Sequence, residues 1–484
     1  MNRKRPFDKP PLWIATRQVH FNKDLRYQPP PDTERLLYEV ADRSTISNKF
    51  DQTEEAYSCI LANLLHADVM NAPLVYSRNS NAYVIERKRY GYDFYTYKTV
   101  IRLVDTMYEM GLVQGVKGRR YGNGRCRSSK IWATEKLLDR LSLTGGKVFI
   151  KPNKEVLFLK DEDKRLQDYP ESNLSRAMRK QLHEFNEMLG ALDISFTLDY
   201  PKLSDRAKSR VNKLCKLLSL SLSNQIVTPD SNPLGMSDRV REYTGKAIPT
   251  KYYIVLDHDA FLLNKLGGLP IILNINRDVN TMRRIFNLDW CHGGRFYHAP
   301  HTTMPSACRK TMVINGEPTV ELDYSGLHIR MLYHRIGLDY QDECYVYDKT
   351  DKDNRIDRER MKLASLIVIN SDDRQKAIKA IHDQCRKKDI HYPAGQSGSY
   401  SALVDRFEEY HEPIKEFFLK GKGLELQYLD STIMASILER MTRKGIPALP
   451  VHDSVICPAR HESSLHQVMV EEYEKVMGFK PVIG

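Results

Sequence analysis

Residues 319–334, TVELDYSGLHIRMLYH, predict a buried strand that passes directly into a helix. The β-branched and apolar residues at the start favour a strand that ends at Asp323, and Ser325 is a suitable N-cap. Apolar residues then recur at helical spacing as far as Gly337, which can end the helix. An acid fixed at a strand end can ligate a metal ion rigidly, although it can also simply stabilise the helix dipole.

Residues 446–457, IPALPVHDSVIC, place His452 and Asp453 between two short apolar runs. This pattern predicts a β-hairpin with a carboxylate at its tip. Two carboxylates on neighbouring strands can hold two divalent cations about 3.5 to 4 Å apart, which stabilises the attacking and leaving oxygens of phosphoryl transfer. The two stretches together therefore predict a two-metal site built on Asp323 and Asp453.

The same two stretches resemble the catalytic motifs of a known enzyme family. Residues 323–334, with Asp-Tyr-Ser followed by an Arg and a His, resemble motif A of family A DNA polymerases. Residues 451–453, Val-His-Asp, resemble motif C of that family. Bacteriophage-type single-subunit RNA polymerases share this palm, and their motif C carries His-Asp-Ser, as residues 452–454 do here.

The resemblance implies an α+β fold with a right-hand polymerase-like palm, built on an antiparallel sheet, with helical fingers and thumb-like helices. It also implies a template-directed nucleotidyltransferase, most directly a DNA-dependent DNA polymerase, that binds two Mg²⁺ ions, or Mn²⁺ in their place. A nucleic-acid primer-template and nucleoside triphosphates would be its partners. Asp323 and Asp453 would hold the metals, the backbone carbonyl of Tyr324 would complete one site, and His452 would brace the hairpin.

A fingers helix is expected over residues 357–370, with Asp357 as its N-cap. Arg358 and Lys362 lie one turn apart on one side of this helix, where two cations can clamp a triphosphate. The resembling family carries Arg, Lys, an aromatic residue and Tyr at this spacing. Leu366 and Asn370 stand at the last two positions here, so this chain departs from the pattern.

Two further residue sets bear on nucleotide binding. Arg374 and Lys376, on the next expected helix, are the substitute for the cation pair. His328 occupies the position at which family A DNA polymerases keep a Glu that blocks the ribose 2′-hydroxyl. Histidine can obstruct this hydroxyl, donate a hydrogen bond to it, or simply pack on the helix, so the choice between deoxyribonucleotides and ribonucleotides stays open.

Residues 95–134 resemble a winged helix-turn-helix, with a helix at 95–110, a strand at 112–116 and a returning strand at 130–134. The loop over 117–130 holds six basic residues and no acid, which suits a wing on a phosphate backbone. A basic hairpin can also be a solvated loop, and winged helices can serve as protein-protein modules. The candidate DNA contacts here are Lys98, Arg102, Lys117, Arg119, Arg120, Arg125, Arg127 and Lys130.

Four residues near the palm are further candidates for DNA contact. Arg295 and Arg309 loosely match basic residues that contact primer-template in the resembling family, and Arg330 belongs to motif A. Gln427 lies on an expected helix just before motif C, where the family has a Gln that contacts primer-template. No spaced acidic motifs of an exonuclease precede the palm, so proofreading is not expected.

The length of 484 residues exceeds what one hydrophobic core usually supports, which predicts several domains. We expect an extended segment at 1–50, a winged-helix-like DNA-binding domain at 51–150, a helical middle region at 151–289, and palm with fingers at 290–484. In the middle region, amphipathic helices over 172–190 and 209–223 suit either a thumb or a plain linker domain.

The formal charge of +12 and the pI of about 9.1 favour a polyanionic partner. The scattered cysteines predict neither a disulfide framework nor a zinc site. No apolar run approaches a membrane span, so a cytoplasmic protein without a membrane partner is expected.

Two alternatives to a DNA polymerase remain open. The first is an RNA-synthesising polymerase or primase of the single-subunit type, which Ser454 and the missing aromatic residue favour. The second is a replication initiator or DNA-binding regulator whose palm is catalytically dead.

Overall fold

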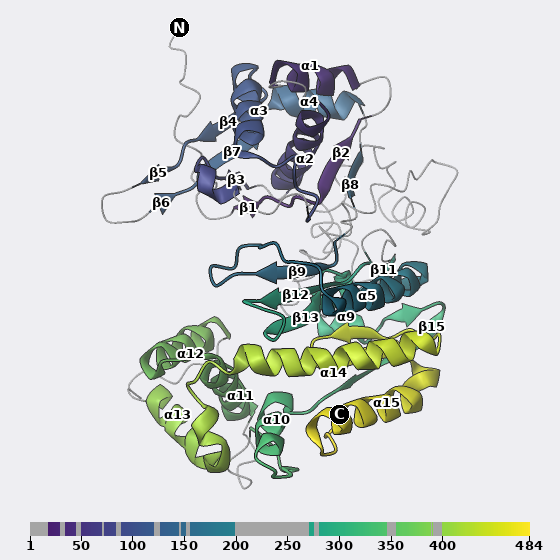
Figure 1. The fold of residues 1–484 in the computed structure, drawn as a ribbon. Helices are drawn as coiled ribbons and strands as arrows, with labels where there is room; N and C mark the ends of the chain where they lie inside the picture. Colours follow the sequence, from purple (N-terminus) through teal and green to yellow (C-terminus); the bar gives the residue numbers. More distant parts are fainter. Residues whose placement is uncertain are drawn as a thin grey trace, which may run out of the picture.

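The structure is a computed structural model. It describes residues 18–29, 34–44, 50–69, 72–83, 89–120, 126–144, 147–151, 155–198, 271–274, 280–345, 355–388, 390 and 399–484. These residues form an α+β fold with largely antiparallel sheets. Figure 1 shows the N-terminal elements, in purple and blue, gathered at one end, and the teal to yellow elements at the other. Among the described helices, none combines the length and the apolar character needed to cross a bilayer.

The N-terminal part packs four helices around small sheets. The helices are α1 (Glu34–Ser44), α2 (Phe50–Val69), α3 (Tyr97–Glu109) and α4 (Glu135–Thr144). One sheet has the order β1-β3-β7-β4, made of Val19–His20, Leu74–Tyr76, Ser129–Ala133 and Val113–Val116. Two further pairs join β2 (Leu25–Gln28) with β8 (Lys147–Ile150), and β5 (Arg119–Arg120) with β6 (Cys126–Arg127).

The order of helix, strand and returning strand predicted for residues 95–134 is confirmed by α3, β4 and β7, and the segment predicted as a loop contains the short paired strands β5 and β6. Helix α3 begins after Thr96, whose side chain accepts a hydrogen bond from the Thr99 amide, and it buries one apolar face. The prediction of an extended segment over residues 1–50 is wrong for residues 34–44, which form the helix α1. Val40 and Ala41 of this helix are fully buried, which explains why it docks on α2.

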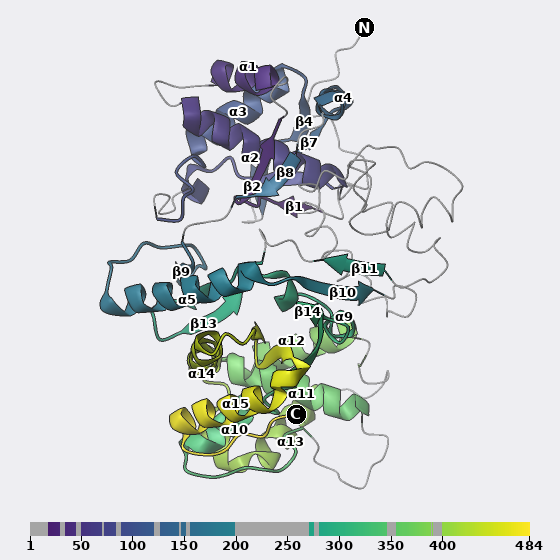
Figure 2. The same ribbon diagram turned by 90° about the vertical axis from the view of Figure 1, so that its right-hand side faces the viewer.

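A six-stranded sheet forms the centre of the other part. Its order is β11-β10-β14-β15-β17-β16, from Ile271–Asn274, Ile194–Leu198, Val313–Ile314, Glu317–Asp323, Ser454–Pro458 and Leu449–Val451. The predicted strand and hairpin that carry Asp323 and Asp453 are confirmed, since β15 and β16 both pair antiparallel with β17. The long helix α14 (Gly423–Arg443) and α15 (Glu462–Met477) lie side by side near this sheet (Figures 1 and 2).

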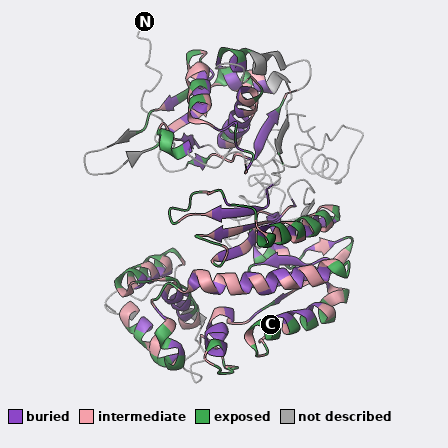
Figure 3. Ribbon diagram, in the orientation of Figure 1, coloured by how far each residue is buried: buried purple, intermediate pink, exposed green. Residues whose placement is uncertain are grey.

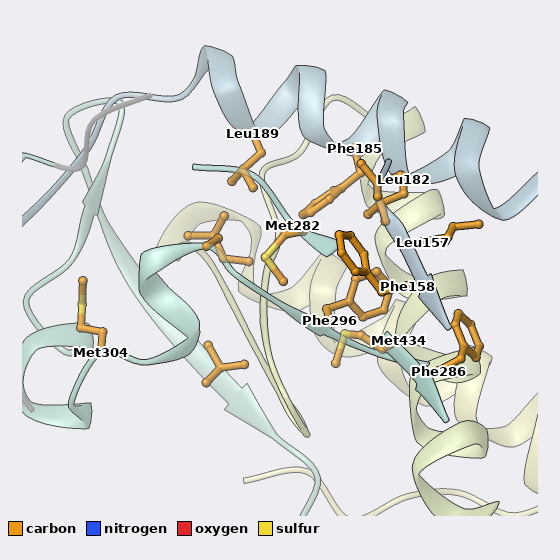
Figure 4. Packing of buried hydrophobic residues seen from close by; sticks show 14 of the residues in the cluster. Leu157, Phe158, Leu182, Phe185, Leu189, Met282, Phe286, Phe296, Met304 and Met434 are labelled. Atoms are coloured by element: carbon orange, nitrogen blue, oxygen red, sulfur yellow. The ribbon is translucent and has the colours of Figure 1, made fainter. Parts of the chain in front are cut away.

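A three-stranded sheet, β13-β12-β9, lies beside α14 on the side facing the N-terminal part. Its strands are Gly293–Tyr297, Arg283–Asn287 and Leu157–Lys160. Helix α5 (Asn173–Ala191) covers it, and Figure 4 shows Leu182 and Phe185 of α5 pointing toward Phe158 and Phe296. The expected domain boundary at 289/290 therefore falls between two paired strands, β12 and β13.

Three helices form a separate cluster beside the six-stranded sheet, drawn in green in Figure 1. They are α11 (Arg355–Asn370), α12 (Arg374–Lys388) and α13 (Ser399–Tyr410), and the shorter α10 (Leu327–Arg335) follows β15 directly. Figure 3 shows buried residues along the inner faces of these helices and exposed residues outside. The helix expected over 209–223 lies outside the described residues.

Both predicted N-caps in this part differ from the structure, Ser325 by one residue and Asp357 by three. Helix α10 begins after Gly326 rather than after Ser325, because Gly326 adopts the left-handed conformation that lets the chain turn sharply from strand to helix. Helix α11 begins at Arg355, which places Asp357 within the first turn. A carboxylate there still stabilises the positive end of the helix dipole.

An ionic cluster around Glu171 ties the N-terminal part to α5. Glu171 accepts hydrogen bonds from Arg89 Nη1 at 2.7 Å and from Arg179 of α5 at 3.0 Å. The hydrogen bonds from Arg179 and then Arg89 lower the pKa of Glu171 to about 2. The ionised form is thus favoured by folding, so its contribution to stability is present above the ordinary pKa near 4.3 and is lost as the pH falls toward 2.

Replacing Glu171 with Gln should therefore lower the melting temperature at pH 7, and the gap from wild type should close between pH 4.3 and 2. The loss at pH 7 should be about 1 kcal/mol or less, because the Glu171 side chain is 40% exposed. Thermal melts across this pH range would measure it, with Glu162→Gln as the matched control at an exposed carboxylate. A constant gap at every pH would contradict this account of Glu171.

Candidate active site

Backbone pairing brings the two predicted carboxylates together. Asp323 is the last residue of β15 and pairs with Ser454, the first residue of β17, so Asp453 precedes its partner by one position. The Tyr324 amide donates a hydrogen bond to the Asp453 carbonyl, with 3.1 Å between nitrogen and oxygen. Asp323 and Asp453 therefore lie at adjoining strand ends, as predicted, and both residues are exposed.

The turn that carries Asp453 holds a non-glycine residue in an unusual conformation. His452 has a φ of 59°, in the left-handed region that favours glycine. Val451 and Ser454 pair across this two-residue connection, so the hairpin enforces the conformation. Strained backbone of this kind persists only where the surrounding structure fixes it, and it is concentrated at functional sites.

A third segment fixes the backbone of Asp323 from the other side. The Asp323 amide donates to the Gly484 carbonyl at 3.1 Å, and the Gly484 amide donates back to the Asp323 carbonyl at 2.9 Å. The Ser325 amide also donates to the Val482 carbonyl at 2.9 Å. Asp323 is therefore held between β17 and the segment around Val482, which makes it a rigid ligand position.

A cavity of about 1150 Å³ opens over these strand ends. Thr319, Glu321 and Asp323 line it together, since alternate residues of a strand face the same side. Asp453, Lys310 and Lys362 also line it, so residues with three carboxylates and two ammonium groups share one space. Its volume exceeds that of most small-molecule pockets.

The electrostatics of this cavity favour a bound cation. Partial burial, followed by the negative charges of Asp453 and Glu321, raises the pKa of Asp323 above its ordinary value, and Lys362 acts in the opposite direction. In the described residues, no three His, Cys, Asp or Glu side chains are grouped as a ready-made metal cage. Mg²⁺ is commonly held by one or two carboxylates together with waters and substrate phosphates, so the donors of Asp323 and Asp453 fit this ion.

Ser454, Glu321 and Arg309 form a hydrogen-bonded chain along one wall of the cavity. Ser454 Oγ donates to Glu321 Oε1 at 2.6 Å, and Arg309 donates to both Glu321 oxygens at 2.9 Å. Arg309 also donates to the Met304 carbonyl at 2.8 Å. Its guanidinium lines the cavity, yet much of its donor capacity serves the protein, so DNA contact by Arg309 stays a prediction.

Arg295 and His328 both bind the buried carboxylate of Asp430 on α14. Arg295 Nε lies 3.1 and 3.0 Å from the two Asp430 oxygens, and His328 Nε2 lies 2.8 Å from Oδ2. Burial lowers the pKa of Arg295, but the hydrogen bond and charge of Asp430 more than offset this effect. The structure thus commits both side chains to Asp430, which does not favour their predicted contacts with DNA and nucleotide.

The predicted cation pair on α11 lies at the edge of the cavity. Lys362 is exposed and lines the cavity, whereas Arg358 is half-buried and lies 3.3 Å from Glu343. The ring of Tyr345 lies near both cations, 5.5 Å from the Arg358 guanidinium and 5.9 Å from Lys362 Nζ. The spacing of four therefore does align the two cations toward one aromatic ring.

The last two residues of the four-residue spacing on α11 are exposed to solvent. Leu366 is 57% exposed, and Asn370 is exposed as well. The substitute cation pair is oriented otherwise, because Arg374 binds Asp405 and Glu408 of α13. Lys362 and Arg358 thus remain the better placed pair.

Three other predicted residues have clear positions. Arg330 is 4% exposed and donates to the carbonyls of Ser325 and Asp342, so it braces the turn after β15 and is not placed to contact DNA. Gln427 is half-buried on α14. His452 lines the cavity, and partial burial followed by the charge of Arg295 lowers its pKa.

The predicted DNA contacts in the N-terminal part are described only in part. Lys98 and Arg102 are exposed on α3, Lys117 is exposed, and Lys130 is half-buried. Arg125 lies outside the described residues, and for Arg119, Arg120 and Arg127 only the strand backbone is described. Of the residues whose side chains the structure describes, Lys98, Arg102, Lys117 and Lys130 do not line the cavity around Asp323.

Sequence reasoning missed two residues of the site. Glu321 lies two positions before Asp323 on the same strand face, a signal that the period of two already contains. Tyr345 follows α10 in a stretch without a recognisable motif, so its place beside Arg358 and Lys362 comes only from tertiary packing.

Comparisons with known proteins assign no family to this chain: no protein-family model matches it, and no curated protein matches it significantly.

Proposed function

We propose that this chain is a template-directed nucleotidyltransferase, most directly a DNA-dependent DNA polymerase without proofreading. The observation that supports it is the position of Asp323 and Asp453 at adjoining ends of β15 and β17, opening into one cavity. Two carboxylates in this arrangement suit a pair of Mg²⁺ ions. When bound, the metals would supply charge neutralisation and a more acidic attacking hydroxyl.

The residues around the two carboxylates have roles in binding and orientation. Lys362 would neutralise the triphosphate from the edge of the cavity, with Arg358 one turn away. Tyr345 offers an aromatic face beside both cations. It would orient the nucleotide in place of the aromatic residue that the resembling family has on the fingers helix and that this chain lacks. Ser454 and Glu321 would keep the hairpin aligned with β15.

Nucleic acid is the polymer partner in this proposal. The net charge of +12 favours a polyanion, and exposed Lys98 and Arg102 on α3 suit contact with a phosphate backbone. The preference for deoxyribonucleotides rests on the resemblance to family A DNA polymerases. An RNA-synthesising activity is the principal alternative and becomes one outcome of the test.

The test is primer extension by the purified full-length chain with Mg²⁺ and a 5′-labelled primer annealed to a DNA template. We expect extension with deoxyribonucleotides, and with single-nucleotide pools we expect addition only of the base complementary to the template. Extension in the ribonucleotide pool but not in the deoxyribonucleotide pool would favour the RNA-synthesising alternative over a DNA polymerase. DNA binding without extension in either pool, with Mg²⁺ or Mn²⁺, would overturn the proposal in favour of a non-catalytic binder.

A further inference from the structure

A second cavity, which we call the junction cavity, lies between the N-terminal part and the strands of the β13-β12-β9 sheet. Its volume is about 590 Å³. Lys23 and Asn81 line it from the N-terminal part, and Lys160 and Lys164 line it from β9 and the loop that follows. Figures 1 and 2 both show β9 on the side of the palm that faces the N-terminal part.

An ion pair fixes the two sides of the junction cavity relative to each other. Arg283 Nη1 lies 2.8 Å from Asp24 Oδ2, and both side chains are largely buried, at 12% and 9% exposure. Lys23, the residue before Asp24, extends over the ring of Tyr95, with Nζ 4.7 Å from the ring centroid. The cavity is therefore a built feature of the fold rather than a gap between loosely placed segments.

The junction cavity concentrates positive charge. Among the described residues that line it there is no carboxylate, and the cations among them are Lys23, Lys160, Lys164, Arg165 and Arg283. Arg165 and Arg283 have aspartate partners, whereas Lys160 and Lys164 have no carboxylate partner within the described part of the chain. Partial burial and then the charge of Lys164 lower the pKa of Lys160, so the two ammonium groups repel each other. A bound anion would relieve this repulsion.

One aromatic contact connects the junction cavity with the active site. Tyr297 of β13 lines the junction cavity, and its ring meets the His452 ring edge-on, with 5.9 Å between centroids. His452 lines the active-site cavity and precedes Asp453. The Tyr297 side chain from the junction cavity and the His452 side chain from the active-site cavity are therefore in contact, so the two cavities are neighbours.

We propose that the junction cavity binds the phosphate backbone of a single nucleic-acid strand whose reacting end lies at Asp323 and Asp453. This inference rests on the proposed function, and it assigns a second site to the same polymer. A volume of about 590 Å³ is that of a pocket for a drug-sized ligand, which suits one or two nucleotides of a single strand. Lysines that track the backbone beside an aromatic ring are the usual means of binding a single strand without sequence preference.

The experiment measures binding without metal or nucleotide, so that it does not depend on catalysis. A fluorescein-labelled 12-nucleotide DNA strand is titrated with the full-length chain in EDTA at several salt concentrations, followed by fluorescence anisotropy. The variant is Lys160→Gln/Lys164→Gln, which keeps most of each side-chain stem and removes both charges. The control is Lys444→Gln/Lys475→Gln, which removes two exposed charges outside both cavities.

We expect the junction variant to bind the strand about 10- to 30-fold more weakly at 0.1 M salt, with a salt dependence reduced by about 1.4 in slope. The control should stay within about twofold of wild type, and a blunt duplex of the same length should bind all three proteins similarly. Equal strand affinity and equal salt slope in the two variants would overturn the proposal, even if wild type extends primers. Circular dichroism and a melting curve would establish that both variants are folded.

A loss of strand binding in the junction variant, together with no primer extension by wild type, would retain the junction site and reject the polymerase. The two proposals therefore fail separately. A loss of equal size for the blunt duplex would overturn the restriction to a single strand.

Discussion

Replacing Asp453 with Asn is expected to lower the rate of nucleotide addition by at least about 10³-fold, and Asp323→Asn should have an effect of similar size. Asparagine preserves the shape of the side chain but removes the charge that would attract a metal ion. Because Asp323 and Asp453 belong to adjoining strand ends, one substitution is enough to disable a shared site. The double variant should then be scarcely slower than either single variant, since residues that act as a unit are not additive.

Single-turnover primer extension would measure this loss, with DNA affinity determined separately by anisotropy. Asp383→Asn, at an exposed carboxylate on α12, is the matched control and should extend primers at the wild-type rate. A second readout needs no activity: Mg²⁺ at a hundredfold excess over its Kd should stabilise wild type by about 2.7 kcal/mol and should stabilise the Asn variants much less. Extension within tenfold of wild type by either Asn variant would place the chemistry elsewhere.

Local sequence patterns predicted the parts of the candidate site that depend on local structure. The strand ending at Asp323, the hairpin around Asp453 and the helix carrying Lys362 each follow from a period or a turn within about fifteen residues. Their assembly also needs the β15 and β17 pairing across 130 positions, which the resemblance implied and hydropathy alone does not determine. The candidate site could therefore be predicted because the local hydropathy pattern and the motif resemblance indicated the same residues.

The roles of several arginines were beyond sequence reasoning for a physical reason. An arginine whose guanidinium is bound inside the fold has fewer donors left for DNA, and whether it is bound depends on tertiary packing. Arg295 finds Asp430, Arg309 finds Glu321, and Arg330 finds backbone carbonyls in a buried turn. A single sequence does not encode these pairings in any local period.

The pairing of Arg295 with Asp430 leads to the largest stability effect that we expect. Asp430→Ala should lower the free energy of unfolding by about 3 to 5 kcal/mol, because it leaves a mostly buried guanidinium without its counter-charge. The Asp430 side chain is 2% exposed and that of Arg295 is 20% exposed, so water compensates little. His328 also loses its hydrogen-bond acceptor at 2.8 Å.

Urea denaturation of the full-length chain would measure this change, with Asp372→Ala as the control. Asp372 is 76% exposed and pairs with Lys376 one turn away, so its loss should cost about 0.3 to 0.5 kcal/mol. The double variant Arg295→Met/Asp430→Leu should recover much of the lost stability, because apolar residues of similar size remove both buried charges at once. Stability of Asp430→Ala within 1 kcal/mol of wild type would show that Arg295 reaches solvent or another carboxylate when its partner is removed. In that variant, the Arg295 guanidinium would be free to contact a phosphate, which is the role that the resemblance to family A DNA polymerases implies for this residue.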